Sequence, residues 1–211
     1  MTVHSIPSPH IRSMINKDTV VRDVFVLGGS AGAIEATTEI LRRLPPSLAV
    51  TIGVAIHRPA AGEGNLRRVL GHYSPLPVTE PTDGDAIQPG VVCLAPRDYH
   101  LLLRDDQWAV TRGPRVHHSR PAVDPLFMSA AESKQKRVVG ILLSGAGSDG
   151  VIGLIAIKAA GGVILVQDPR EAGVASMPSR ALREDDVDAV MTVAGIAAAI
   201  PALALGRPVT D

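Results

Sequence analysis

The chain has 211 residues, of which 45% are hydrophobic and 20% are charged, a balance typical of globular proteins. Its 21 basic and 21 acidic residues cancel, so the net charge argues against nucleic acid or an anionic membrane surface as a partner. Cys93 is the only cysteine, which excludes an intramolecular disulfide and argues against a thiolate zinc site.

The N-terminal stretch MTVHSIPSPHIRSMINKDTV mixes proline, serine, histidine and charged residues. It lacks the continuous apolar core of a secretion signal. No apolar run in the chain approaches the roughly 20 residues that cross a bilayer. We therefore expect residues 1–22 to form a flexible leader, and we expect a cytoplasmic protein without direct membrane insertion.

The next part of the chain alternates between strand-like and helix-like patterns. Residues 23–28 and 50–56 are short apolar runs typical of buried strands, whereas residues 33–44 and 65–73 carry apolar residues at helical spacing. Two prolines end the first of these helices. This β-α-β-α order predicts a parallel sheet with helical crossovers.

The middle of the chain has a different pattern, with short apolar runs separated by glycine, proline and aspartate. Residues 77–81, 90–96, 99–106 and 108–114 indicate four short strands, and residues 104–107 indicate a hairpin turn. We expect these strands to form a β-ribbon beside the main sheet.

The β/α alternation resumes at Asp124 and Pro125, which are typical of a helix N-cap followed by proline at the first helical position. Further strands are expected at 137–144, 163–167 and 187–192, and further helices at 150–160, 177–184 and 195–200. The fold class expected is α/β, with a doubly wound, mainly parallel sheet flanked by helices and an added antiparallel β-ribbon. One domain is expected over residues 23–203, followed by a tail over 204–211.

Three polar residues follow three of the expected strands. Ser30 follows the first strand, His57 the second, and Asp149 lies in the loop after the strand at 137–144. The carboxyl ends of parallel strands meet at one edge of a sheet, where ligands bind. Serine, histidine and aspartate are the groups that nucleophilic acyl transfer needs, because imidazole accepts the serine proton and a carboxylate orients the imidazole.

Each of these residues also has a structural interpretation. Ser30 precedes a helix and could be its N-cap, Asp149 could cap the helix that follows it, and His57 could face solvent. Glycines around Ser30 and Asp149 allow a close approach of the backbone to a substrate, although tight packing of a strand against a helix also favours glycine. The three residues together are more specific than any one of them.

Rival motifs fit less well. GGSAG satisfies the Gly-x-Ser-x-Gly nucleophile elbow of α/β-hydrolases, but in that family the histidine comes last, whereas here His57 precedes Asp149. The first loop lacks Gly-x-Gly-x-x-Gly, and no acidic residue ends the second strand, which argues against a dinucleotide site. His117 and His118 are adjacent and lack a metal-ligand spacing. We expect neither a metal nor a cofactor.

Several blocks resemble the catalytic domain of the chemotaxis protein-glutamate methylesterases, the CheB family. The resemblance covers residues 23 to about 200. Its blocks are GGSAGAIEA, AIHRP, DGDAIQPGVVCLAPRDYHLLL, HSRPAVDPLFMSAA, GILLSGAGSDGVIGLIAIKAAGG and VASMPSRAL. Their order and spacing make the resemblance highly specific.

The resemblance implies hydrolysis of glutamate γ-methyl esters on chemoreceptor helices with release of methanol, and deamidation of receptor glutamines as a second activity. It implies a bacterial signal-transduction hydrolase of the serine esterase type. The family triad falls on Ser30, His57 and Asp149, and the implied oxyanion donors are the backbone N–H groups of Ala31 and Ala146. A binding module of the same fold without turnover, or an esterase for another ester, remains an alternative.

The chain departs from the family pattern in three ways. Ala31 and Ala146 stand where the family commonly has threonine and methionine, and Arg58 stands where a methionine is familiar. Arg58 predicts a more cationic rim. Only about 22 residues precede the first expected strand, too few for the receiver domain that commonly precedes this catalytic domain. The expectation is therefore a free-standing catalytic domain, or a catalytic domain separated from its regulator.

Overall fold

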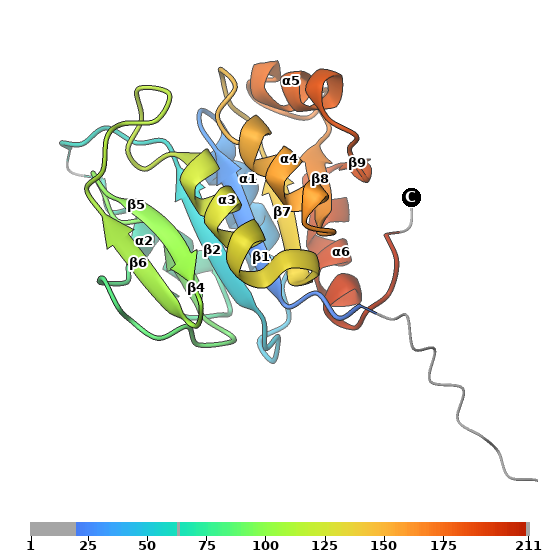
Figure 1. Cartoon of the computed structure of the whole chain (residues 1–211), viewed down its shortest axis with the longest axis horizontal. Coiled ribbons are helices and arrows are strands. Elements are labelled where there is room, and N and C mark those ends of the chain that lie inside the picture. The colour runs from blue at the N-terminus through green and yellow to red at the C-terminus, as the bar shows by residue number, and fades with distance from the viewer. Residues whose placement is uncertain (1–19, 63, 210–211) are drawn as a thin grey trace, which may run out of the picture.

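The computed structural model describes residues 20–62 and 64–209. A seven-stranded sheet runs through the molecule in the order β3-β4-β2-β1-β7-β8-β9, and every pair of neighbouring strands is parallel (Figure 1). Its strands are β1 (Val24–Gly29), β2 (Thr51–Ile56), β3 (Val78–Thr79), β4 (Val92–Leu94), β7 (Val138–Leu142), β8 (Val163–Gln167) and β9 (Ala189–Met191). β1 lies at the centre of the sheet, and the strand order reverses there.

Helices cover both faces of the sheet, as expected for a doubly wound fold (Figure 1). They are α1 (Ala33–Arg42), α2 (Leu66–Tyr73), α3 (Val123–Lys134), α4 (Val151–Ala159), α5 (Ser176–Glu184) and α6 (Val193–Ala204), with a short 3-10 turn at Gln135–Arg137. Helices α1, α2 and α6 pack on one face, and α3 and α4 pack on the other. In the described residues, no helix is both long enough and apolar enough to cross a membrane.

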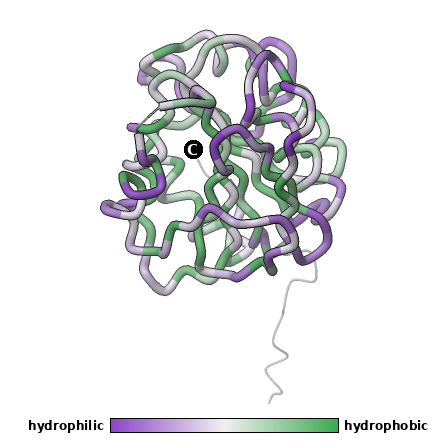
Figure 2. Tube along the Cα trace, turned by 90° about the vertical axis from the view of Figure 1, so that its left-hand side faces the viewer, coloured by the Kyte–Doolittle hydropathy of each residue, from purple (hydrophilic) through white to green (hydrophobic). Residues whose placement is uncertain are grey.

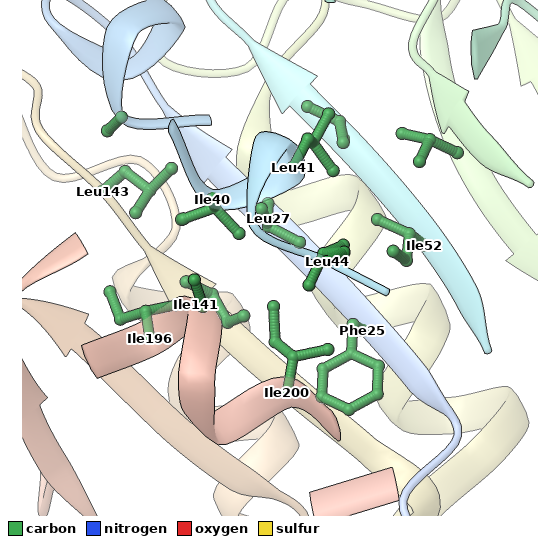
Figure 3. Close-up of a cluster of buried hydrophobic side chains, with 14 of the residues drawn as sticks. Phe25, Leu27, Ile40, Leu41, Leu44, Ile52, Ile141, Leu143, Ile196 and Ile200 are labelled. Atoms are coloured by element: carbon green, nitrogen blue, oxygen red, sulfur yellow. The ribbon is translucent and has the colours of Figure 1, made fainter. Parts of the chain in front are cut away.

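Two hydrophobic cores lie on the two faces of the sheet because successive strand residues point to opposite sides. In β1, Phe25 and Leu27 join the core beneath α1 and α6, whereas Val24 and Val26 join the core beneath α3 and α4. Figure 3 shows the first of these cores, where Ile196 and Ile200 of α6 lie close to strand side chains. Along the chain trace, hydrophobic segments run through the interior and hydrophilic ones lie mostly at the periphery (Figure 2).

The expectation of a four-stranded ribbon was wrong for two of its strands. β3 and β4 extend the main parallel sheet, with Val78 opposite Val92 and Ile52 of β2 opposite Val92 on the other side. β4 is buried throughout, which suits an inner strand of a parallel sheet. Only β5 (His100–Arg104) and β6 (Gln107–Thr111) form an antiparallel hairpin, which turns at Asp105 and Asp106 as expected.

The hairpin packs against the sheet through Trp108, which is 1% exposed. A Cβ atom on Gly53 of β2 would lie 3.1 Å from the Trp108 ring, so glycine at this position leaves room for the indole. On its other side the hairpin is joined to α3, because Ser129 Oγ accepts a hydrogen bond from Leu103 N at 3.0 Å. The hairpin therefore supports α3 as well as the sheet.

Thr37 lies on the buried face of α1, and its Oγ1 has no hydrogen-bond partner among the described residues. A buried hydroxyl without a partner costs about 1–3 kcal/mol. We expect Thr37→Val to raise the free energy of unfolding by about 1 kcal/mol, measured by urea denaturation. Thr38→Val is the control, because Thr38 Oγ1 already donates to Ile34 O at 2.7 Å. An equal effect of both changes would contradict the prediction.

Candidate active site

Ser30 follows the central strand directly, at the carboxyl edge of the sheet. Its backbone N–H donates to Ser144 O at 2.9 Å, which ties it to the loop after β7. On the other side, the His57 N–H donates to Gly29 O at 3.0 Å. The backbone thus brings the three loops together at the place where the strand order reverses, as the sequence predicted.

Ser30 is not the N-cap of α1. The N-cap is Gly32, at φ 80°, and no side chain caps this helix. A Cβ atom on Gly32 would lie 2.6 Å from Ser144 Oγ, so both the left-handed backbone and the close contact require glycine there. The interpretation of Ser30 as the N-cap of α1 is therefore wrong, and the Ser30 hydroxyl does not cap this helix.

His57 and Asp149 form a close pair. His57 Nε2 lies 2.6 Å from Asp149 Oδ2, and the two side chains are 15% and 1% exposed. Among the described residues, no hydrogen bond joins Ser30 Oγ to His57. Contacts between a nucleophile and its base are often long in a free enzyme. Since Nε2 faces Asp149, Nδ1 is the ring nitrogen that has no hydrogen-bond partner among the described residues.

Asp149 is held by the first turn of α3, not by the helix that follows it. Its Oδ2 accepts from Val123 N at 2.7 Å and its Oδ1 from Asp124 N at 2.9 Å. Burial alone would raise the pKa of Asp149, but the hydrogen bonds from His57 and from these two N–H groups outweigh burial and lower the pKa. Asp149 is therefore charged and fixed beside the imidazole.

Asp124 is not the N-cap of its own helix either. It lies inside the first turn of α3, and its Oδ1 accepts from Gly150 N at 2.9 Å and from Gly153 N at 2.7 Å, at the start of α4. Burial raises the pKa of Asp124, and the charge of Asp149 adds to this effect. The sequence does not predict this contact, because local capping rules concern the residues of a single helix.

The sequence did not point to Ser144, which is fully buried and whose carbonyl oxygen accepts the Ser30 N–H. Its hydroxyl donates to Ala31 O at 2.7 Å and accepts from Val174 N at 2.9 Å, while its N–H donates to Gln167 Oε1 at 2.8 Å. These contacts join the loops after β1, β7 and β8. The only sequence signal was a serine at the end of the apolar run in the block LLSGAGSDG.

The sequence model of the CheB methylesterase family matches residues 25–200. The chain belongs to the CheB methylesterase family. It is 38% identical over 176 residues to a putative protein-glutamate methylesterase/protein-glutamine glutaminase of Leptospira interrogans, covering 83% of this chain and 91% of that protein. It is 38% identical over 171 residues to a protein of Anaeromyxobacter dehalogenans named protein-glutamate methylesterase/protein-glutamine glutaminase 2, covering 81% of this chain and 50% of that one.

The crystal structure of the CheB methylesterase catalytic domain from Thermotoga maritima has the same fold. It superposes with a TM-score of 0.81 at 29% identity, covering 86% of this chain and 98% of that chain. The seven-stranded parallel sheet with its separate hairpin is thus the fold of a CheB catalytic domain.

In this CheB family member, the backbone N–H groups of Ala31 and Ala146 have no partner among the described residues. Both residues are exposed. The loop that carries Ala146 runs close to Ser30, since a Cβ atom on Gly145 would lie 3.0 Å from Ser30 Cβ. Gly145 N itself donates to Val174 O at 2.9 Å and is therefore occupied.

The expectation that Arg58 makes the rim more cationic was wrong. The Arg58 side chain is 8% exposed and pairs with Glu80, and it also donates to Ala95 O. The loop after His57 is instead held by Arg97, which donates to Pro59 O at 2.6 Å and to Gly64 O at 2.7 Å. Arg58 thus connects the end of β2 to the segment after β4, and its charge is balanced by Glu80.

His117, Asp124 and Asp149 bring possible metal-ligating atoms within 4.8 Å of one another. Their carboxylate oxygens, however, already accept the four N–H groups of the two helix starts and the two imidazole contacts. These oxygens therefore already accept hydrogen bonds from peptide N–H groups and imidazoles. This arrangement fits helix capping better than the coordination of a cation.

The lowered pKa of Asp149 predicts how the stability of the protein changes at acidic pH. Because its pKa is lower in the folded state than the usual value of about 3.9, the charged carboxylate stabilises the fold above that pH. This contribution is lost as the pH falls through the folded-state pKa. We expect the difference in unfolding free energy between the wild type and Asp149→Asn to be constant above about pH 5 and to shrink below about pH 4, in urea denaturation across pH. A difference that stays constant to pH 3 would contradict this.

Proposed function

We propose that this protein is a serine esterase that hydrolyses glutamate γ-methyl esters on methyl-accepting chemotaxis receptors and releases methanol. The single observation that carries the proposal is the part-buried His57–Asp149 pair, at the edge of the sheet where Ser30 also lies, in a chain of the CheB methylesterase family. The names of its relatives, protein-glutamate methylesterase/protein-glutamine glutaminase, support the reaction and its substrate class. We also propose that residues 23–203 make up the catalytic domain and that it works in the cytoplasm.

In this mechanism Ser30 is the nucleophile and His57 the general base. Ser30 Oγ attacks the ester carbonyl carbon while Nδ1 of His57 takes the hydroxyl proton. The carbonyl π bond opens to an oxyanion, which the N–H groups of Ala31 and Ala146 stabilise. When the oxyanion collapses, the C–O bond to methoxide breaks, and His57 returns its proton so that methanol leaves.

Water then repeats the sequence on the acyl-enzyme. His57 removes a proton from water, the resulting hydroxide attacks the acyl carbon, and the bond to Ser30 Oγ breaks. Ser30 recovers its proton from His57, and the product is the glutamate carboxylate. Asp149 orients the imidazole and stabilises its charged form in both halves, since it accepts from Nε2. A side-chain amide would react in the same way and release ammonia.

The experiment is methanol release from membranes that carry a methylated chemoreceptor, with the same membranes left unmethylated as a blank. We expect wild-type protein to release methanol and Ser30→Ala to release none above the blank. Ammonia release from receptors with glutamine at the methylation sites tests the second activity. Turnover of small methyl esters without turnover of receptor would assign an esterase for another substrate, and binding without turnover of either would assign a binding module.

A further inference from the structure

The start of α4 depends on a carboxylate from another helix. Gly150 is the N-cap of α4, and it has no side chain with which to accept the first N–H groups. Asp124 Oδ1 accepts two of them instead, from Gly150 N at 2.9 Å and from Gly153 N at 2.7 Å. Since Asp124 lies in the first turn of α3, it ties the start of α4 to the start of α3.

The opposite contact has the same form. No side chain of the segment before α3 caps that helix. Asp149, the residue immediately before Gly150, accepts from the N–H groups of Val123 and Asp124 at 2.7 and 2.9 Å. Asp149, which precedes α4, therefore caps α3, and Asp124, which lies in α3, caps α4. Asp149 Oδ2 also faces His57 Nε2, so this reciprocal pair ends at the imidazole.

A third residue closes the network at the surface. His117 Nε2 lies 3.1 Å from Asp124 Oδ2, and the side chains are 35% and 5% exposed. Among the described residues, the charged or titratable side chains that face Asp124 are His117, from the loop before α3, and Asp149, from the loop before α4. His57 lies beyond Asp149. The remaining Asp124 contacts are peptide N–H groups.

We propose that Asp124 is a positioning residue, which fixes the peptide at Gly150 so that Asp149 presents Oδ2 to the His57 imidazole. The inference rests on the proposed esterase function, which supplies the reaction that it serves. Asp124 is buried, so we expect it to act on turnover and to leave substrate binding unchanged. A residue needed only for folding would lower stability without loosening the His57–Asp149 contact in the protein that remains folded.

The test compares Asp124→Ala and Asp124→Asn with a matched control, Asp188→Ala. Asp188 Oδ2 likewise accepts a backbone N–H, that of Ile164 at 2.9 Å, and its Oδ1 pairs with Lys158 at the far end of α4. The measurements are kcat and KM for methanol release, the melting temperature, and the proton NMR signal of the His57 Nε2–H in protein labelled with ¹⁵N-histidine. The NMR signal reports the contact with Asp149 directly.

We expect Asp124→Ala to lower kcat by about 100-fold, because small displacements of a catalytic group cost about this much, with KM within about twofold. Asp124→Asn keeps an acceptor oxygen but loses the charge-assisted hydrogen bonds, so we expect it to lower kcat by about fivefold. Both should shift or broaden the His57 Nε2–H signal. Asp188→Ala should lower the melting temperature with kcat and the NMR signal unchanged. In an Asp149→Asn background, Asp124→Ala should lower kcat by less than about twofold.

Any of three results would overturn the inference. The first is a wild-type kcat with an unchanged His57 signal in Asp124→Asn, and the second is a loss of kcat in Asp188→Ala as large as that in Asp124→Ala. The third is that Asp124→Ala lowers kcat as much in the Asp149→Asn background as it does in the wild type. If Asp124→Ala does not fold, Asp124→Asn decides. If wild-type protein releases no methanol, the proposed function fails, whereas the His57 signal in Asp124→Asn still decides whether Asp124 holds Asp149 in place.

Discussion

Removing any one member of the proposed triad is expected to abolish nearly all methyl-ester turnover. Ser30→Ala removes the attacking oxygen and His57→Ala removes the base. Asp149→Asn keeps the shape of the carboxylate but allows the wrong imidazole tautomer, a change that lowers turnover about 10⁴-fold in serine proteases. The losses should not add, because the remaining members have little left to assist once one is gone. The measurement is kcat for methanol release in the single and double variants.

Folding must be measured alongside, since Asp149 also caps α3. Loss of a cap costs about 1 kcal/mol, so we expect Asp149→Asn to melt earlier than wild type and the Ser30 and His57 variants to melt close to it. Circular dichroism at the assay temperature serves as the control. An Asp149→Asn protein that stays folded and keeps near-normal turnover would reduce Asp149 to a structural cap, and losses that multiply in the double variants would disprove a shared mechanism.

The second large effect is expected from Gly28→Ala in β1. A Cβ atom on Gly28 would lie 2.1 Å from Val123 Cγ1 and 3.1 Å from Phe127 Cζ, so α3 must move away from the sheet. Overpacking of this kind costs about 3 kcal/mol. Because Val123 N–H binds Asp149, we also expect turnover to fall about 100-fold in the folded protein. Urea denaturation and kcat measure the two effects.

A second substitution tests the cause of this effect. Val123→Ala removes both methyl groups nearest to the added Cβ, so the double variant Gly28→Ala/Val123→Ala should recover stability and turnover relative to Gly28→Ala alone. Gly71→Ala in α2 is the matched control, because its Cβ would meet Val78 at 3.8 Å, an ordinary contact, and alanine favours a helix. No recovery in the double variant would show that the Val123 contact is not the cause.

The sequence predicted those parts of the site that depend on strand ends. Ser30, His57 and Asp149 follow parallel strands, and parallel strands place their carboxyl ends at one edge whatever their order in the sheet. The sequence did not predict the role of Asp124, because its partners are the N–H groups of a distant helix and local capping rules see only one helix at a time. β3 and β4 were assigned to a ribbon for a related reason, since a run of two or three residues does not reveal its partner strand.

The position of Trp108 makes its fluorescence a measure of how α3 packs against the sheet. It is the only tryptophan in the chain, and its indole is buried against β2 in the core shared with α3. Emission from such an indole is at short wavelength and shifts to the red when water reaches it. Because β5 is tied to Ser129 of α3, and the first turn of α3 holds Asp149, release of α3 from the sheet would change the fluorescence as well as the chemistry. Stopped-flow fluorescence would therefore detect a release of α3 from the sheet without any added label.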